Sequence, residues 1–163
     1  MRTKTQKIAS SALLAALIFI ATRFISIPLP AVGYVNMGDG LVILAGWMLT
    51  PGCGFLAAGI GSALSDVLSP FVVYAPVTFL IKGLMAVIIH LFIKALKKHK
   101  IVAGIIGGLT AETVMVSGYL LFESVLYGFK TALVSIPFNA IQGGVGLIVG
   151  VILIYIFSKR KIG

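Results

Sequence analysis

The stretch GLVILAGWMLTPGCGFLAAGIGSAL, residues 40–64, decides the fold, because it is almost unbroken and apolar except for a turn signal near its middle. A helix needs about 20 apolar residues to cross a bilayer. The stretch is therefore either one long span or two short spans that meet at Thr50-Pro51-Gly52, since proline cannot continue a helical hydrogen-bond ladder. The choice sets the number of spans in the whole chain at five or six.

The rest of the chain is equally apolar. Of its 163 residues, 60% are hydrophobic and only 10% are charged, whereas about a quarter of the residues in a soluble domain are charged. This composition excludes a soluble enzyme, a nucleic-acid-binding domain and a disordered chain. Six spans of about 20 residues would use about 120 residues, so we expect no folded soluble domain beside them. The single Cys53 is expected to pack as a small apolar side chain.

The net charge of +9 marks one side of the membrane. Most of the 13 lysines and arginines lie in three short segments at the ends of apolar runs, at 2–7, 94–100 and 159–161. Positive clusters in short flanks face the cytoplasm. Five spans would put the second and third segments opposite the first, whereas six spans put all three on one side. The positive-inside rule therefore favours six.

We therefore predict an all-α integral membrane protein, a six-transmembrane-helix bundle with cytoplasmic N- and C-termini. It would be a single transmembrane domain, residues 1–163, that passes several times through a prokaryotic plasma membrane. The first span is expected to be retained and not cleaved as a signal peptide, because no convincing small-residue cleavage site follows it. The spans are expected at roughly 8–27, 38–50, 53–68, 77–96, 101–123 and 133–157.

Polar side chains inside the spans give the main functional signal, because a charge at a helix centre costs about 2.5 to 3.5 kcal/mol. In the six-span topology all of them except Glu112, near the middle, fall in the outer half. This layout predicts an outward-facing pocket for a small molecule. Hydrogen bonds between helices are the structural alternative for each residue, and Asp66 and Lys82 could neutralise each other. The candidate binding residues are Asp39, Asp66, Tyr74, Lys82, Glu112, Tyr119, Glu123, Asn139 and Gln142.

The third outer loop carries the aromatic residues Phe71, Tyr74 and Phe79. Anchoring at the membrane interface is the ordinary role of such residues. A lid that stacks on a flat ligand is the functional alternative. The sequence leaves both open.

Several catalytic motifs are missing from the sequence. It has no Walker A pattern, no HExxH, no nucleophile elbow and no Cys/His metal set. We expect no enzyme activity, no cofactor, no metal and no nucleic-acid partner. A small bundle with an outward pocket is more like a binding subunit than a complete pump. A small membrane enzyme that uses the buried acids, or a purely structural subunit, remains as an alternative.

Two runs carry a resemblance to a known family. YVNMGDGLVILAGWMLTPGCGFLAAGIGSALSDVL, residues 34–68, and YAPVTFLIKGLMAVI, residues 74–88, resemble the substrate-binding S components of energy-coupling factor (ECF) vitamin transporters. The specific part of the resemblance covers about residues 10–88, and the last two spans match mainly by hydropathy. The pattern is similar to the riboflavin, vitamin B6 and hydroxymethylpyrimidine branch at Gly38-Asp39, Gly61-Ser62-Ala63, Asp66, Thr78 and Lys82-Gly83.

The resemblance implies a function and partners. It implies six helices, a pocket in the outer half, and docking on a transmembrane coupling protein with two cytoplasmic ATPases. The spacing of Ala12 and Ala16 alone leaves internal packing and docking equally open, and the family's AxxxA motif favours docking. The expected ligand is a small flat heteroaromatic vitamin of the pyridoxine or hydroxymethylpyrimidine type, with riboflavin as the alternative.

Overall fold

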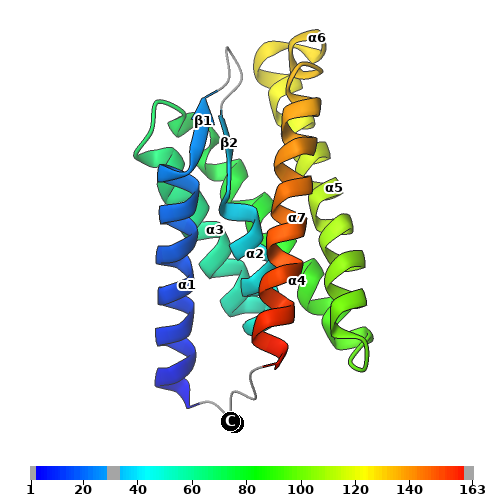
Figure 1. The fold of residues 1–163 in the computed structure, drawn as a ribbon. Helices are drawn as coiled ribbons and strands as arrows, with labels where there is room; N and C mark the ends of the chain where they lie inside the picture. Colours follow the sequence, from blue (N-terminus) through cyan, green and yellow to red (C-terminus); the bar gives the residue numbers. More distant parts are fainter. Residues whose placement is uncertain (1–2, 29–33, 160–163) are drawn as a thin grey trace.

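The structure is a computed structural model that describes residues 3–28 and 34–159. The described chain forms a bundle of helices with a small two-stranded hairpin at one end (Figure 1). The elements are α1 (Lys4–Phe24), β1 (Ser26–Pro28), β2 (Tyr34–Asn36), α2 (Gly38–Met48), α3 (Pro51–Val67), the 3-10 turn η1 (Val72–Tyr74), α4 (Ala75–Ala95), α5 (Lys100–Tyr127), α6 (Phe129–Ala132) and α7 (Ser135–Lys159).

Within the described residues, four helical segments are long and apolar enough to cross a membrane. They are α1, α4 together with η1, α5, and α6 together with α7. Their most apolar windows have mean hydropathies between 1.6 and 2.3, and less than half of each window is buried inside the bundle. The remaining side chains of these helices therefore present apolar surface, which suits contact with lipid.

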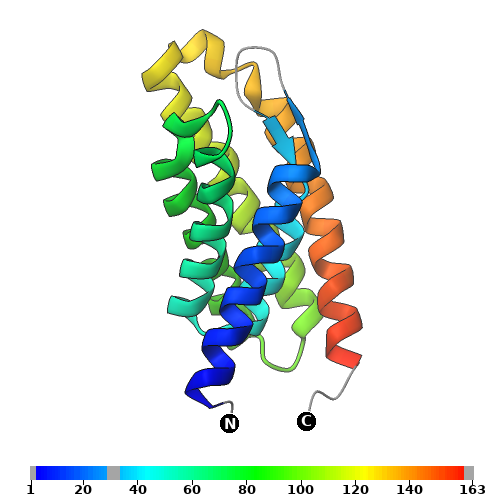
Figure 2. The ribbon, with the colours of Figure 1, turned by 90° about the vertical axis from the view of Figure 1, so that its left-hand side faces the viewer.

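The stretch at residues 40–64 divides into two helices. α2 ends at Met48, Thr50 has an extended backbone with φ −67° and ψ 158°, and Pro51 is the first residue of α3. Proline suits this position, because the first N–H of a helix has no intrahelical partner. α2 and α3 have 11 and 17 residues, and they run in opposite directions beside each other (Figures 1 and 2).

The first helix ends earlier than the sequence predicts. α1 stops at Phe24, and the next residues form β1, which pairs antiparallel with β2 so that Ile27 lies opposite Val35. Pro28 explains the extended backbone, since a proline disfavours the helical conformation of the residue before it. Further along the chain, α5 continues to Tyr127 and ends at Gly128. The backbone of Gly128 has a φ of +84°, a conformation that favours glycine.

The core lies around α2, the short helix in the middle of the bundle. α2 packs against α1, α3, α4 and α7. Its contact with α4 is close, because a Cβ on Gly46 would lie 2.6 Å from the carbonyl oxygen of Ala86. α1 and α3 approach equally closely, with the position of a Cβ on Gly61 2.5 Å from the carbonyl oxygen of Ala15. Small residues thus set the helix spacing, as is common in membrane bundles.

The two ends of the bundle differ in chemistry. The hairpin, η1 and α6 lie at one end, which we call the hairpin end (Figure 1). α1 begins, α4 turns into α5 and α7 ends at the opposite end (Figure 2). We call this second end the basic end. It carries the described lysines of the three positive segments: Lys4, Lys7, Lys94, Lys97, Lys98, Lys100 and Lys159.

Candidate functional site

A pocket opens near the hairpin end, between the β-hairpin strand β2 and five helices. Its cavity volume is about 30 Å³, well below the roughly 300 Å³ of the smallest typical ligand sites, so a vitamin would have to push the lining side chains apart. The small volume means that side chains approach one another closely across the pocket. Polar and aromatic side chains dominate the lining, which consists of Thr22, Tyr34, Asn36, Ser62, Asp66, Phe71, Tyr74, Thr78, Lys82, Tyr119, Glu123, Asn139 and Gln142.

A buried ion pair forms the floor of this pocket. The Lys82 ammonium on α4 donates to Asp39 at the start of α2, and both side chains are almost completely buried, with 1% and 0% of their surface exposed. Gln142 on α7 donates to the second Asp39 oxygen at 2.6 Å. Losing one partner of such a pair typically costs about 3 to 5 kcal/mol, because the other charge stays buried and uncompensated.

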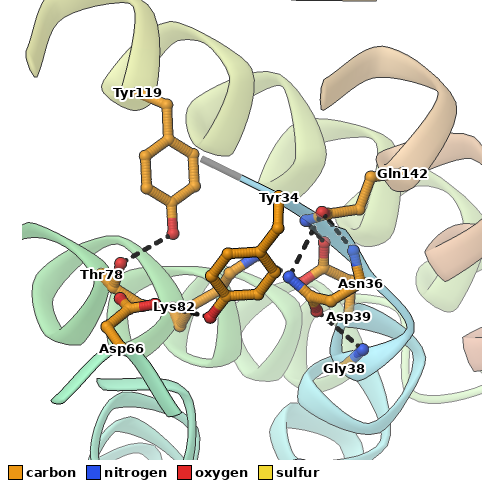
Figure 3. Close-up of polar contacts among 9 residues, drawn as sticks. All are labelled: Tyr34, Asn36, Gly38, Asp39, Asp66, Thr78, Lys82, Tyr119 and Gln142. Atoms are coloured by element: carbon orange, nitrogen blue, oxygen red, sulfur yellow. Dashed lines mark hydrogen bonds and ion pairs between the residues drawn. The ribbon is translucent and has the colours of Figure 1, made fainter. Parts of the chain in front are cut away.

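The hairpin is tied to this floor through one amide. Gln142 Oε1 accepts from the backbone N–H of Asn36 at 2.8 Å and from its side-chain amide at 3.3 Å. The Asn36 side-chain oxygen in turn accepts from the Gly38 N–H at 2.9 Å (Figure 3). β2, the first turn of α2 and α7 are therefore held in one hydrogen-bonded network.

The opposite wall carries the Asp66 carboxylate, of which only one oxygen accepts a hydrogen bond from the described residues. The Tyr34 hydroxyl donates to Asp66 Oδ1 at 2.5 Å (Figure 3). It also lies 3.2 Å from Ser65 Oγ. Burial, reinforced by the Asp66 carboxylate, raises the pKa of Tyr34, which keeps the phenol a donor. Among the described residues, Asp66 Oδ2 has no hydrogen-bond partner, and the same holds for Thr22 Oγ1 and Ser62 Oγ. Buried polar atoms are normally paired, so these three pocket residues offer unused bonding capacity.

Aromatic rings close the side of the pocket towards η1. Tyr74 packs against Phe71, Tyr119 and Phe122, with ring centroids 6.3, 6.4 and 5.4 Å away. The Lys82 ammonium lies 5.7 Å from the centre of the Tyr119 ring, a distance at which a cation is attracted to the ring face. Phe79 does not join this group, because it packs edge-to-face on Phe55 at 5.3 Å between α3 and α4.

Both oxygens of the second carboxylate in the lining, that of Glu123, accept hydrogen bonds. Glu123 accepts from the Tyr74 hydroxyl at 3.3 Å and from the Ser135 hydroxyl. Thr78 and Tyr119 share a hydrogen bond of 3.0 Å next to it (Figure 3). These bonds connect η1, α4, α5 and α7, so the aromatic wall is fixed from several helices.

Glu112 lies beneath the pocket and faces α7. It is 6% exposed, and neither of its oxygens has a hydrogen-bond partner within the described part of the chain. Two α7 glycines make room for it: a Cβ on Gly143 would lie 3.0 Å from Glu112 Oε2, and a Cβ on Gly146 3.1 Å from Oε1. Lys82, the expected counter-ion of Glu112 or Asp66, is paired with Asp39 instead.

The structure thus gathers most of the predicted site residues in one place. Seven of them line the pocket, and Asp39 and Glu112 lie below it. Sequence reasoning overlooked Thr22, Tyr34, Asn36 and Ser62. Tyr34 and Asn36 belong to a strand that lies between the first two expected spans, and Thr22 and Ser62 look like ordinary small residues of a span. No group of three or more His, Cys, Asp or Glu side chains that could hold a metal occurs in residues 3–28 and 34–159.

Comparisons with known proteins agree with this architecture. Residues 2–159 match the family model described as "ECF-type riboflavin transporter, S component". A solved structure described as "Structure and mechanism of the S component of a bacterial ECF transporter" superposes with a TM-score of 0.69 at 26% identity, over 96% of this chain and 98% of that one. A Pyrococcus woesei protein, described as uncharacterized and from a gap 3′ region, is 37% identical over 144 residues, 86% of this chain and 94% of its own length.

The fold and the site define the class: a helical membrane protein with a pocket lined by polar and aromatic side chains near one end. Within that class, the chain belongs to the S-component family of ECF-type riboflavin transporters. It is accordingly an integral membrane protein and a transporter subunit, not an enzyme. S components bind a small vitamin and work together with an ECF module.

Proposed function

We propose that this chain binds riboflavin in the pocket near the hairpin end and delivers it to an ECF module. The observation that carries the proposal is the set of buried polar atoms without partners on Thr22, Ser62 and Asp66, three residues that line the pocket beside its aromatic wall. A flavin has a flat ring with N–H and carbonyl groups and a hydroxylated side chain. Aromatic side chains pack well on such a ring, and the unpaired atoms suit its polar edge. The family description supports the same ligand.

The candidate residues take two roles in this proposal. Those that line the pocket would contact the vitamin: Asp66, Tyr74, Lys82, Tyr119, Glu123, Asn139 and Gln142. Asp39 and Glu112 would support the floor, where Asp39 neutralises Lys82 and fixes the orientation of Gln142. The vitamin would then bind above an ion pair, Lys82 with Asp39, whose opposite charges already neutralise each other.

A smaller vitamin of the pyridoxine or hydroxymethylpyrimidine type is the second candidate. The small volume of the pocket favours it, because a one-ring ligand needs less movement of Phe71 and Tyr74 than a three-ring flavin does. Both ligands are flat heteroaromatic molecules with hydrogen-bonding edges, so the same lining chemistry would serve either.

Competition titration separates the two ligands. Riboflavin is added to the purified full-length chain, and binding is followed by the loss of flavin fluorescence. We expect saturable binding of riboflavin that an excess of pyridoxine or hydroxymethylpyrimidine leaves unchanged. Displacement of the flavin by either small vitamin would favour the second candidate. If folded protein bound none of the three, the proposed vitamin site would be rejected.

The proposal includes a topology and a docking face. Six spans with cytoplasmic termini would put the basic end inside the cell and the pocket outside, in agreement with the positive-inside rule. The module would comprise a transmembrane coupling protein and two cytoplasmic ATPases. Ala12 and Ala16 on α1 are both exposed, which supports their use as a smooth face for the coupling protein.

A further inference from the structure

A second cavity lies at the basic end, at the turn between α4 and α5. Its cavity volume is about 360 Å³. Its walls consist of Lys97, Lys98, His99, Lys100, Ile101, Val102 and Ser158. The cavity thus combines three exposed lysines with the aliphatic side chains of Ile101 and Val102, and Ser158 near the end of α7 completes its wall.

No carboxylate balances these lysines. The four acidic residues of the chain are Asp39, Asp66, Glu112 and Glu123, and each of them lies in the site described above or beneath it. The first turn of α5 contains no acidic residue, and His99 makes no capping hydrogen bond with its side chain. Lysines at the start of a helix oppose its dipole, so a bound anion would relieve an unfavourable arrangement of charge.

The apolar side of the cavity continues along the bundle. Ile101 and Val102 form part of its wall, and the following turns of α5 expose Ile105, Ile106 and Leu109. Tyr155 on α7 is also exposed, and the Lys159 ammonium lies 4.3 Å from the centre of its ring. Tyrosine and lysine together are typical of the level of lipid headgroups. A ligand with an anionic head and long apolar chains would match both the lysines of the cavity and the exposed apolar face of α5.

We propose that this cavity binds the phosphate headgroup of an anionic phospholipid, whose acyl chains lie along the exposed face of α5. The lysines supply charge, and the aliphatic wall distinguishes a lipid from a free phosphate. The site lies at the opposite end of the bundle from the vitamin pocket, so it is independent of the ligand that the pocket takes. It would hold the α4–α5 turn at the membrane surface.

Native mass spectrometry of the full-length chain in detergent tests this proposal with added phosphatidylglycerol, phosphatidylcholine or inorganic phosphate. We expect phosphatidylglycerol to bind in preference to phosphatidylcholine and to resist displacement by inorganic phosphate. The double variant Lys98→Gln, Lys100→Gln should weaken phosphatidylglycerol binding about tenfold or more, since each lysine near an anionic headgroup contributes about fivefold. The single variant Lys98→Gln should show about half of that effect on a logarithmic scale.

The matched control is Lys4→Gln, Lys7→Gln, which removes the same charge from the same end without touching the cavity. Phosphatidylglycerol binding to the control should stay within about twofold of the parent chain, because attraction between exposed charges is largely screened beyond about 10 Å at moderate salt. Equal losses in both double variants would overturn the proposal, as general surface charge would then explain the binding. Displacement by inorganic phosphate, or equal binding of both lipids, would overturn it as well.

Discussion

Asp66 and Glu123 both line the pocket, yet they differ in how much of their bonding capacity is used. Glu123 accepts from Tyr74 with one oxygen and from Ser135 with the other. Asp66 accepts from Tyr34 with Oδ1 only, and its Oδ2 has no partner among the described residues. The free oxygen of Asp66 is therefore the atom from which a ligand would gain most.

This difference gives a prediction at the residue scale. Asp66→Asn keeps the shape but replaces an acceptor with a donor, so it should weaken riboflavin binding at least about tenfold, or about 1.4 kcal/mol. That loss is modest for a hydrogen bond to a charged group. Glu123→Gln should change affinity by less than about threefold, as its oxygens already have partners. Fluorescence titration measures both, and a larger effect at Glu123 would contradict the assignment.

The sequence predicted the polar residues of the site better than their pairing. Lys82 was expected beside Asp66 or Glu112, but it pairs with Asp39. Depth along a helix can be counted from the sequence, whereas the direction of a side chain depends on helix rotation. Thr22 and Ser62 were overlooked because a hydroxyl in an apolar span is ordinary, and its missing partner is visible only in three dimensions.

At the scale of elements, glycines decide how closely helices pack. Gly46→Ala should lower the unfolding free energy by about 1 to 3 kcal/mol, because the new methyl group would overlap the Ala86 carbonyl of α4. Gly52→Ala is the matched control: no atom lies within 4 Å of its added Cβ, so stability should be unchanged or slightly higher. Thermal unfolding in detergent measures both variants. Equal stability of the two would contradict the close α2–α4 contact.

The exposed face of α1 gives a second prediction at this scale. Ala16→Trp should abolish uptake of the vitamin and weaken copurification with the coupling protein, while ligand binding stays unchanged, because a bulky ring blocks close helix approach. Leu121→Trp is a suitable control, since Leu121 is 69% exposed on α5, away from α1. Normal uptake by the Ala16 variant would show that this face does not dock.

The sequence was less informative about short elements than about long helices. The long apolar runs that became α4, α5 and α7 could be recognised from hydropathy, and the Pro51 signal marks where α2 gives way to α3. The hairpin of β1 and β2 was not predicted. Its three-residue strands are too short for alternation to be recognised. β2 is also held by a bond from Asn36 to Gln142, which is 106 residues away in the sequence and so cannot be inferred from local pattern.

For the whole molecule, the main prediction is its orientation. In a Cys53→Ser background, a cysteine introduced by Lys98→Cys should resist an impermeant thiol reagent added outside intact cells. Lys130→Cys on α6, near the opposite end of the bundle, should react. The positive-inside rule gives this outcome, because the lysines of the basic end would then face the cytoplasm. Labelling of Lys98→Cys from outside would contradict the six-span topology.

The central claim is that the pocket near the hairpin end holds a vitamin, and the most direct test is to identify what the protein carries. The chain is purified in mild detergent from cells supplied with riboflavin, denatured, and its released small molecules are identified by mass spectrometry. We predict riboflavin at close to one molecule per parent chain, and markedly less from the Asp66→Asn variant. A folded parent chain that releases no vitamin, or equal amounts of riboflavin from both proteins, would contradict the account.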